Sequence, residues 1–427
     1  MGTKAIKRVL LIAYHFPPVA GSSGVLRTLK FVRYLPEFGW QPSVLTVHPR
    51  AYERLSDSQL AQVPKDVPVV RAFALDAARH MALAGRYPRC FALPDRWVSW
   101  LLGAIPAGLK MIRQQRPSIL WSTYPMPTAH LVGLLLHRLT GLPWIADCRD
   151  SMLDDVYPAD PLKRRIHAWI ERRVIRSAIR VVFTTPGTLR MYAERYPEVP
   201  KDHWVLIANG YDEEDFCKYF EMTAVADSSS GKLTLLHSGL VDPVDRDPRH
   251  FLAALSRLKR SEDIKPQGLR VVFRASGLDD ELRSWIHALE IDDIVEVAPP
   301  LPYHEALAEM REATALLLLQ GACCNHQIPA KLYEYLKVGR PIIGLTDVEG
   351  DSAALLRELA ADTILPLDDE AAIVAALPDI LMKLQAGCLP IAADEAVALH
   401  SRRSRTAELA QLLDQVVLGA GSPENMK

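Results

Sequence analysis

The chain has 427 residues, too many for one ordinary hydrophobic core, so two or three domains are expected. Its formal net charge of -1 gives no overall attraction to nucleic acid, and affinity for an anionic surface must come from a local patch. Apolar residues make up 49% and charged residues 24%, as in ordinary globular proteins. The six cysteines follow no disulfide spacing, which favours a reducing compartment.

The N-terminal residues imitate a targeting signal but lack its other features. Lys4, Lys7 and Arg8 precede an apolar run, yet residues 15–18 follow at once without a small-residue cleavage pattern. The longest apolar stretches, such as the one that begins at Ala313, are too short to span a bilayer. We therefore expect a cytoplasmic protein, neither secreted nor transmembrane, with peripheral attachment to the inner face of the membrane kept open.

Short apolar runs alternate with helical patterns through the first half of the chain. Strands are expected at residues 8–14, 42–47, 67–71, 118–122, 143–148, 180–184 and 204–208. Helical patterns lie between them, for example at 25–38 and 128–140. This alternation predicts parallel strands with crossover helices, that is, a doubly wound α/β sheet.

A polar stretch with a run of serines, residues 221–232, predicts a linker. After it the alternation restarts, with strands expected at 233–237, 269–274, 294–298, 315–320, 341–345 and 363–367. We expect an α/β protein with two Rossmann-like doubly wound domains that face each other across a cleft. The expected bounds are 1–220 and 233–395, with a C-terminal helix at 396–427 that packs back on the N-terminal domain.

The turn after the first strand, residues 15–24, contains two glycines that suit an anion site. Gly21 and Gly24 allow close approach of the backbone, and free amides at the start of a helix attract negative charge. The turn is not GxGxxG, and His48 rather than an acidic residue follows the second strand, which disfavours a nicotinamide dinucleotide. A glycine turn without any ligand stays open as the alternative.

Two groups of side chains in the first half are candidates for contact with a polar substrate. Asp147, Arg149 and Asp150 follow the fifth strand, where carboxylates can take a proton or orient a hydroxyl group. The alternative is an Arg–Asp pair that ties loops together. Trp97 and Trp100 form the second group, for which sugar stacking is possible in principle but core packing is favoured.

Residues 161–180 form a basic segment with seven Lys and Arg residues and one Glu. Apolar residues lie between the cations at helical spacing, which predicts a cationic amphipathic helix of the kind that lies on anionic lipid. A helix that packs on the sheet and exposes an Arg-rich face is an equal alternative. Nucleic acid is disfavoured because no aromatic platform is present. The residues expected at the membrane are Lys163, Arg164, Arg165, Trp169, Arg172 and Arg173.

The first turn of the second half, residues 237–248, offers a second place for phosphate. Gly239 allows close approach, and the Arg246 guanidinium can pair with phosphate through two hydrogen bonds. A capped helix with a surface arginine is the alternative. Further on, the sequence CCNH at 323–326 suggests zinc, but adjacent cysteines rarely bind one tetrahedral ion, and no metal is expected.

The sequence NHQIPAKLYEYLKVGRPIIGL, residues 325–345, predicts a helix followed by a core strand. Pro329 suits the first helical position and Gly339 ends the helix. Lys331 and Glu334 share a face of this helix that is not the buried one. They are either a solvated ion pair or part of a ligand site.

Taken together, these motifs resemble the family 4 glycosyltransferases of the GT-B fold over nearly the whole chain. The matching segments are residues 15–24 with 39–46, residues 207–216 and, most specifically, IPAKLYEYLKVGRPII at 328–343. The resemblance implies transfer of a sugar from a nucleotide-diphosphate sugar to a hydroxyl acceptor. It further implies that no metal or other cofactor takes part and that the anomeric configuration is retained.

The resemblance also implies roles for individual residues of the donor site. Glu334 would hold the ribose hydroxyl groups, and Lys331 and Arg246 would be the cations near the diphosphate. Gly21 and Gly24 would line the donor phosphates from the other domain. Uridine is expected as the donor base before guanosine, on the family's example.

The chain departs from the family pattern at one position of the donor site. Many members carry a Glu eight positions before the residue that matches Glu334, and this chain has His326 there. Relatives with the Lys-x-x-Glu-Tyr variant also lack that Glu, so activity is still expected. His326 and Gly239 are counted with the donor site, while the identity of the sugar stays open.

The acceptor side is expected in the N-terminal domain. Asp150 is the first candidate for a general base and His130 the second. The basic helix suits a lipid-linked saccharide, which suggests assembly of a surface polysaccharide such as lipopolysaccharide or exopolysaccharide. Two alternatives stay open, a nucleotide-sugar epimerase and a non-catalytic scaffold of the same fold. The residues expected to contact the acceptor are His15, Trp97, Asp147 and Arg149.

Overall fold

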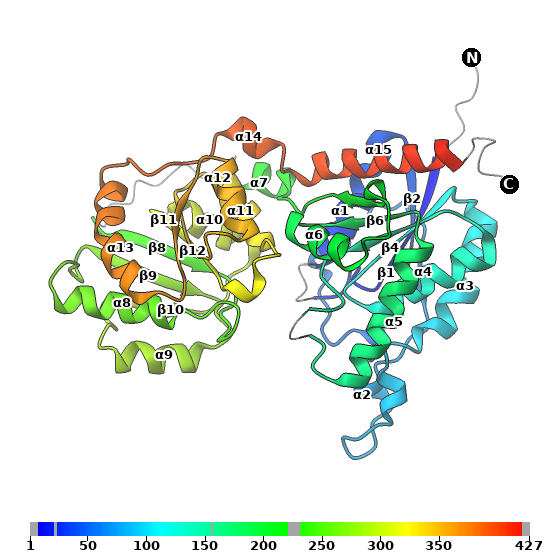
Figure 1. Cartoon of the computed structure of the whole chain (residues 1–427), viewed down its shortest axis with the longest axis horizontal. Helices are drawn as coiled ribbons and strands as arrows, with labels where there is room; N and C mark the ends of the chain where they lie inside the picture. Colours follow the sequence, from blue (N-terminus) through cyan, green and yellow to red (C-terminus); the bar gives the residue numbers. More distant parts are fainter. Residues whose placement is uncertain (1–6, 21–23, 155–156, 221–230, 421–427) are drawn as a thin grey trace. The chain divides into compact units, whose positions relative to one another are not determined.

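The computed structural model describes residues 7–20, 24–154, 157–220 and 231–420 (Figure 1). Gly21 and most of the expected linker, 221–232, lie outside the described residues. The chain forms two compact units, residues 1–209 with 402–427 and residues 210–401. The boundary precedes the expected position at residue 220 because Gly210 and Tyr211 already pack on the second unit: Tyr211 N donates to His400 O at 3.3 Å.

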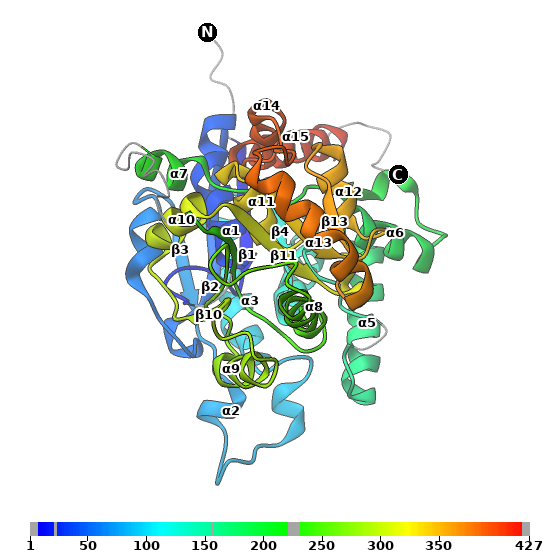
Figure 2. The same ribbon diagram turned by 90° about the vertical axis from the view of Figure 1, so that its left-hand side faces the viewer.

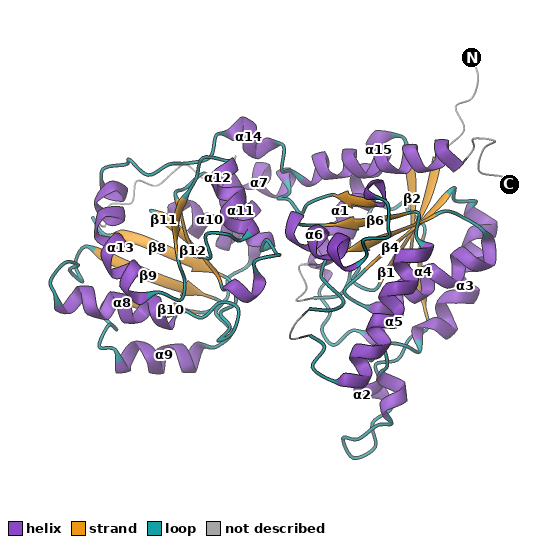
Figure 3. Ribbon diagram, in the orientation of Figure 1, coloured by secondary structure: helices purple, strands orange, loops and turns teal. Residues whose placement is uncertain are grey.

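In the described residues of the first unit, seven parallel strands form one sheet in the order β3-β2-β1-β4-β5-β6-β7 (Figure 3). The central strands are mostly apolar, apart from residues at their ends, because helices cover both faces of the sheet. The strands are β1 (Lys7–Ala13), β2 (Trp40–Val47), β3 (Val69–Ala72), β4 (Ile119–Thr123), β5 (Trp144–Cys148), β6 (Arg180–Phe183) and β7 (Trp204–Leu206).

The helices of the first unit divide between the two faces of its sheet. The helices α3 to α6 and the sheet share one apolar core, and α1 and the C-terminal helix α15 share the other. The small α2 lies in the long segment between β3 and α3. The helices are α1 (Gly24–Tyr34), α2 (Ala77–His80), α3 (Trp100–Gln115), α4 (Pro127–Thr140), α5 (Pro161–Ser177), α6 (Pro186–Arg195) and α15 (Arg402–Ala420).

The second unit repeats this architecture with six parallel strands in its described residues, in the order β10-β9-β8-β11-β12-β13. Every strand that the sequence predicted in either unit is present within a few residues of its expected bounds. The strands are β8 (Leu233–Ser238), β9 (Leu269–Arg274), β10 (Val295–Ala298), β11 (Ala315–Gln320), β12 (Ile342–Thr346) and β13 (Thr363–Leu365).

The helices of the second unit also cover both faces of its sheet (Figures 1 and 2). The helices α8, α9 and α13 share the apolar core with one face. On the other side α10 contacts α7 and α11, and α11 contacts α14. The helices are α7 (Glu213–Phe220), α8 (Arg249–Arg260), α9 (Asp279–Ala288), α10 (Tyr303–Glu312), α11 (Ala330–Val338), α12 (Asp351–Glu358), α13 (Glu370–Gln385) and α14 (Asp394–Ala398).

Each sheet has one point at which the order of its strands reverses. The chain leaves β1 through β2 and β3 on one side and continues with β4 on the other side of β1. In the second unit it leaves β8 through β9 and β10 and continues with β11 on the other side of β8. Open α/β sheets bind ligands at the carboxyl ends of such strand pairs. The ends of β1 and β4, and those of β8 and β11, are therefore the places to look for a site.

Candidate functional site

In the first unit, Arg149 joins the segments that follow three strands of the sheet. Its Nε donates to Tyr124 O at 2.6 Å, beyond β4, and its Nη1 donates to Gly24 O at 2.8 Å, at the start of α1. A Cβ at Gly24 would lie 2.5 Å from this Nη1, so a larger residue here would force the guanidinium to move. Burial lowers the pKa of Arg149, but the group stays charged at neutral pH. Positive charge thus lies at the reversal point, beside the amino end of a helix.

His15 follows β1 and lies close to this guanidinium. Burial, with a smaller contribution from the charge of Arg149, lowers the pKa of His15 from 6.5 to about 3. The imidazole is therefore neutral at neutral pH and can exchange hydrogen bonds with a hydroxyl group. Gly24 and Arg149 are in contact, and His15 lies near the same guanidinium, beyond the carboxyl end of β1.

Asp147 is fully buried and belongs to an internal ion pair with Arg27 of α1. The Arg27 Nη2 lies 2.8 Å from Asp147 Oδ1, and its Nε lies 3.1 Å from Oδ2. Thr123 Oγ1 donates to Oδ2 at 2.7 Å, and Arg27 also donates to the carbonyl oxygens of Ile207 and Ala208. Both carboxylate oxygens are thus used inside the protein, which corrects the expectation that Asp147 contacts an acceptor.

His130 is also a core residue. It is completely buried, and its Nδ1 forms a 2.7 Å hydrogen bond with Ser122 Oγ, which in turn accepts from Trp144 Nε1 at 2.8 Å. Burial lowers the pKa of His130 to about 4, so the ring is neutral. Because a substrate hydroxyl group cannot reach it, the expectation of His130 as a second candidate base is corrected.

Asp150 and Trp97 differ in their exposure to solvent. Asp150 is exposed and follows Arg149, whose carbonyl oxygen accepts a 2.8 Å hydrogen bond from Thr184 Oγ1. Trp97 is half-buried: its indole N–H donates to Ala51 O at 3.1 Å, and its ring packs against Tyr14 at 4.6 Å between centroids. The packing interpretation therefore suits Trp97 better, and Asp150 is a solvent-exposed carboxylate that follows β5.

The basic segment forms α5, which begins after Asp160, whose Oδ1 accepts from Lys163 N at 2.8 Å. Its inner face is buried against the sheet, and Trp169 on its outer face is 51% exposed. Arg165, Arg172 and Arg173 are exposed with it, while Lys163 and Arg164 are half-buried. The helix therefore packs on the protein through its inner face, and it also exposes a cationic and aromatic outer face. In the described ranges, no helix has the length and apolar character that a bilayer span requires.

In the second unit, Lys331 and Glu334 form a half-buried ion pair on α11. Lys331 Nζ lies 2.7 Å from Glu334 Oε2, and Tyr303 OH donates to Oε1 at 3.1 Å. Glu334 is only 9% exposed, whereas the Lys331 side chain is 31% exposed. A surface pair would leave both groups in water, so the solvated alternative does not describe this one. The helix ends at Gly339 in the left-handed conformation, as the sequence predicted.

Further hydrogen bonds fix α11 against the ends of β8 and β11. Tyr335 OH accepts from Ser238 N at 2.8 Å, at the end of β8. At the end of β11, Gln320 Nε2 donates to the carbonyl oxygens of Cys324 and Gln327, both at 2.8 Å. The segment that carries His326 and leads into α11 is therefore held at both sides.

Arg246 lies in the segment that follows β8. This segment contacts the residue after the end of β11. Gly321 N donates to Asp245 O at 2.7 Å, and Arg246 Nη2 lies 3.0 Å from Asp245 Oδ2. His237 is buried at the end of β8, and burial lowers its pKa to about 4, with smaller contributions from the charges of Arg246 and Lys331. Both cations therefore act on the same end of the sheet, where Gly239 also lies.

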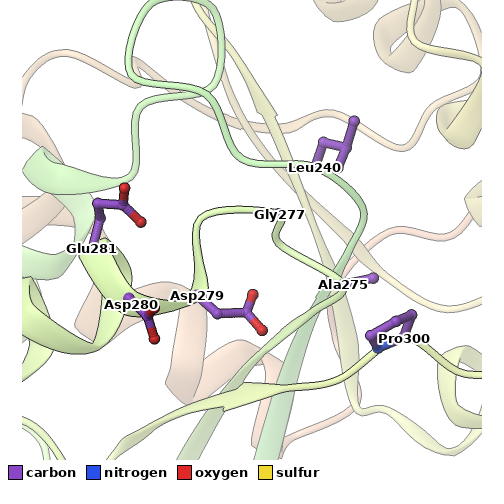
Figure 4. Close-up of a pocket in the computed structure, with 7 residues that line it drawn as sticks. All are labelled: Leu240, Ala275, Gly277, Asp279, Asp280, Glu281 and Pro300. Atoms are coloured by element: carbon purple, nitrogen blue, oxygen red, sulfur yellow. The ribbon is translucent and has the colours of Figure 1, made fainter.

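A pocket of about 510 Å³ opens beside this reversal point, at the carboxyl ends of β8, β9 and β10 (Figure 4). Leu240, Ala275 and Pro300 form its apolar part, and Asp279 and Glu281 of α9 lie on the other side. The segment after Pro300 leads to Tyr303, the partner of Glu334. The pocket is thus joined to the ion pair on α11 by a short stretch of chain.

Several residues at these two ends could not be found by sequence reasoning. Arg27 and Tyr303 act through partners that are far away in the sequence, at separations of 120 and 31 residues, and Gln320 acts through main-chain carbonyl groups that no side-chain pattern reveals. The sequence contains one weak sign of the role of Arg27, because its cationic side chain interrupts the apolar pattern of α1. Among the described residues, no group of three or more His, Cys, Asp or Glu side chains is arranged to hold a metal ion.

Comparison with known proteins gives a family match to part of the chain. Residues 24–210 match the glycosyl transferase 4-like domain. A D-inositol 3-phosphate glycosyltransferase from Arthrobacter sp. (strain FB24) is 26% identical over 241 residues. That match covers 53% of this chain and 55% of the relative, so it spans about half of each.

Solved structures resemble the chain over nearly its whole length. The Anabaena protein HepE in complex with UDP has a TM-score of 0.64 at 12% identity, over 96% of this chain and all of that one. A UDP-N-acetylglucosamine 2-epimerase has a TM-score of 0.53 at 11% identity, over 99% of both chains. At such identities the likeness concerns the fold, which is the two-domain GT-B arrangement of parallel α/β sheets.

Proposed function

We propose that the chain is a glycosyltransferase that transfers a sugar from a nucleotide-diphosphate sugar to a hydroxyl acceptor, a function that the match of residues 24–210 to the glycosyl transferase 4-like domain supports. The observation that carries the proposal is the half-buried Lys331–Glu334 pair at the strand-order reversal of the second unit. A carboxylate with little exposure suits recognition of neighbouring hydroxyl groups, which donate to its oxygens. In this proposal Glu334 binds the donor ribose.

The donor diphosphate is proposed to lie near Lys331 and Arg246. Both side chains are about one-third exposed and both lower the pKa of His237, which supports a common location. As the sugar–phosphate bond breaks, negative charge grows on the leaving diphosphate, and fixed cations stabilise it. A reaction that keeps the anomeric configuration is part of the proposal, and His326 and Gly239 are placed with this donor site.

The donor base is proposed to be uracil, in the pocket of about 510 Å³ beside β8 to β10. The apolar side chains of Leu240 and Pro300 offer a surface for a flat ring. Two solved structures of this fold, HepE with UDP and with UDP-glucose, contain the nucleotide. Guanine is the second candidate.

The acceptor is proposed to bind to the first unit, at the ends of β1 and β4. Arg149 and the neutral His15 can orient a polar acceptor, and the exposed Asp150 is the proposed base for its hydroxyl group. Gly24 is proposed to bring the start of α1 close to an anionic group. Trp97, which like His15 packs against Tyr14, is proposed to line the acceptor site.

The acceptor is further proposed to be lipid-linked, so that the protein works at an anionic membrane surface in the assembly of a surface polysaccharide. Trp169 and the arginines on the outer face of α5 support this proposal. Leu83, 86% exposed, and Phe91, 41% exposed, lie in the segment before α3, and Arg89 of this segment is paired with Asp160 at the start of α5. Apolar and cationic groups on neighbouring segments suit the interface of a bilayer.

A transfer assay with labelled UDP-glucose, UDP-N-acetylglucosamine and GDP-mannose tests the proposal. Each donor is incubated with a detergent-solubilised bacterial lipid extract, and label is measured in the organic phase. The native chain is expected to move label from one donor, and Glu334→Ala to move none. The matched control is Asp379→Ala, which removes the carboxylate of an exposed helical pair with Lys383 and should leave transfer unchanged.

Two outcomes would replace this function by another. Conversion of the donor sugar to its epimer without any acceptor would favour an epimerase, which shares the fold. Binding of a donor without release of nucleoside diphosphate, under every acceptor condition, would favour the non-catalytic scaffold.

A further inference from the structure

Two adjacent cysteines, Cys323 and Cys324, lie between β11 and α11. Their Sγ atoms are 3.8 Å apart, the Cys323 side chain is exposed, and that of Cys324 is half-buried. The proposed donor function uses neither thiol. They are nevertheless located beside the segment of Arg246, since Cys323 Sγ is 3.6 Å from Val244 O.

The backbone around the two cysteines is held in place. Cys324 N donates to Gly321 O at 3.0 Å, and Cys324 O accepts from the buried Gln320 side chain at 2.8 Å. Gly321 N is in turn bonded to Asp245 O at 2.7 Å. The two thiols are therefore presented in a fixed arrangement, so little conformational freedom is lost when both bind one centre.

The distance between the sulfur atoms allows both to bond one soft centre. Two bonds of about 2.3 Å to a shared centre can span at most about 4.6 Å, and the sulfur atoms are 3.8 Å apart. Tetrahedral zinc would need further ligands, and no cluster of three or more potential ligands exists among the described residues. Soft centres that are satisfied by two thiolates, such as trivalent arsenic in an organoarsenical, need none.

We propose that Cys323 and Cys324 form a dithiol site that binds thiophilic soft centres, of which a trivalent arsenical is the representative ligand. The reaction with a hydrated arylarsenous acid forms two S–As bonds and breaks two As–O bonds. Each thiol proton leaves with one hydroxyl group as water, and no electrons are transferred. Burial raises the pKa of Cys324 to about 12, so the second bond should form faster as the pH rises.

A ligand bound to the two cysteines is also expected to hinder binding of the donor nucleotide, and this expectation rests on the proposed function. A group bound to both sulfurs would lie against the segment that carries Arg246, a proposed ligand of the diphosphate. UDP and the arsenical should therefore hinder each other, and UDP should slow formation of the adduct.

The test is intact-mass spectrometry of the full chain after treatment with phenylarsine oxide. The expected result is one adduct that resists excess 2-mercaptoethanol, is removed by dithiothreitol, and maps to the peptide that contains both cysteines. Cys323→Ser and Cys324→Ser should each weaken retention by ~100-fold, because a second bond within one molecule adds an effect of this order. The matched controls are Cys90→Ser and Cys388→Ser, which remove exposed thiols that have no adjacent cysteine.

The outcomes separate this proposal from the proposed function. A monothiol-resistant adduct that persists in Cys323→Ser, that maps elsewhere, or that fails to form in the native chain overturns the dithiol site. Peptide mapping of the native chain decides this even if a variant does not fold. If the adduct forms as expected but UDP does not change its rate, the dithiol site stands and the link to the donor fails.

Discussion

Each unit has an ion pair near the carboxyl ends of its parallel strands, but the two pairs differ in how deeply they are buried. At the end of β5 in the first unit, the carboxylate of Asp147 is fully buried and bound on all sides by Arg27 and Thr123. In the middle of α11 in the second unit, Glu334 has a small exposed fraction and its partner Lys331 is 31% exposed. The comparison teaches that a charged pair beside the strand ends can meet a ligand only where part of it stays exposed to solvent.

The largest effect is expected from breaking the buried pair of the first unit. Arg27→Met leaves the Asp147 carboxylate buried without a cation, which should lower the free energy of unfolding by about 3–5 kcal/mol. Urea unfolding followed by circular dichroism measures it. The control Arg283→Ala removes an exposed pair with Asp280 and should leave the unfolding curve where it is. A loss in Arg27→Met no larger than in this control would contradict the structural role.

Removing the cation of the ion pair in the second unit should change the affinity for UDP and not the free energy of unfolding. Lys331→Ala removes a charge proposed to contact the diphosphate and should weaken UDP binding by about 1.5–3 kcal/mol, or roughly 10- to 100-fold. Isothermal titration calorimetry measures the affinity. Lys383→Ala is the matched control, because it removes the lysine of an exposed helical pair. Equal affinities in both variants would remove Lys331 from the donor site.

The buried histidines should make stability depend on pH. Burial lowers the pKa of His130 from 6.5 to about 4, so the unfolded chain binds more protons than the folded chain between these values. Stability should therefore be complete above about pH 6.5 and fall as the pH drops toward 4. The expected contribution is about 1.4 kcal/mol per pH unit for this residue. His130→Gln should reduce the slope of unfolding free energy against pH by that amount, and an unchanged slope would contradict it.

The smallest effects are expected on the outer face of α5. Each exposed cation that lies near an anionic bilayer contributes about 1 kcal/mol, so Arg172→Gln and Arg173→Gln should each weaken vesicle binding slightly and the pair more. Flotation with phosphatidylglycerol vesicles at low salt measures binding, and UDP affinity is the control that should not move. If the native chain does not float with these vesicles, the membrane proposal fails.

Much of the fold follows from sequence because local patterns determine it. The apolar runs that became β1 and β8 are short, β-rich and bounded by turns, and the start and end of α11 follow from Pro329 and Gly339. The end of the first unit could not be predicted in the same way. It depends on Gly210 packing against His400, a contact between residues 190 positions apart that no local pattern records.

The candidate site was predictable in part, and its errors arose where burial decides the direction of a side chain, on strand β5 for Asp147 and on helix α4 for His130. Sequence reasoning located Asp147, Arg149 and Asp150 at a strand end but could not tell which faces the interior, because side chains alternate between two covered faces. Asp147 turned inward to Arg27, and His130 turned inward to Ser122. On α11 the helical period predicted that Lys331 and Glu334 share a face, but not that Glu334 would be buried beneath Tyr303.

The central claim is that Glu334 of the second unit binds the ribose of the donor nucleotide. Its most direct test is a thermal-shift panel with uridine, guanosine, adenosine, cytidine and thymidine diphosphates on the native chain, Glu334→Ala and the control Asp379→Ala. A ligand that binds the folded state raises the melting temperature by mass action. We expect uridine diphosphate to stabilise the native chain and the control but not Glu334→Ala. Equal stabilisation of all three proteins, or of none by any nucleotide, would contradict the account.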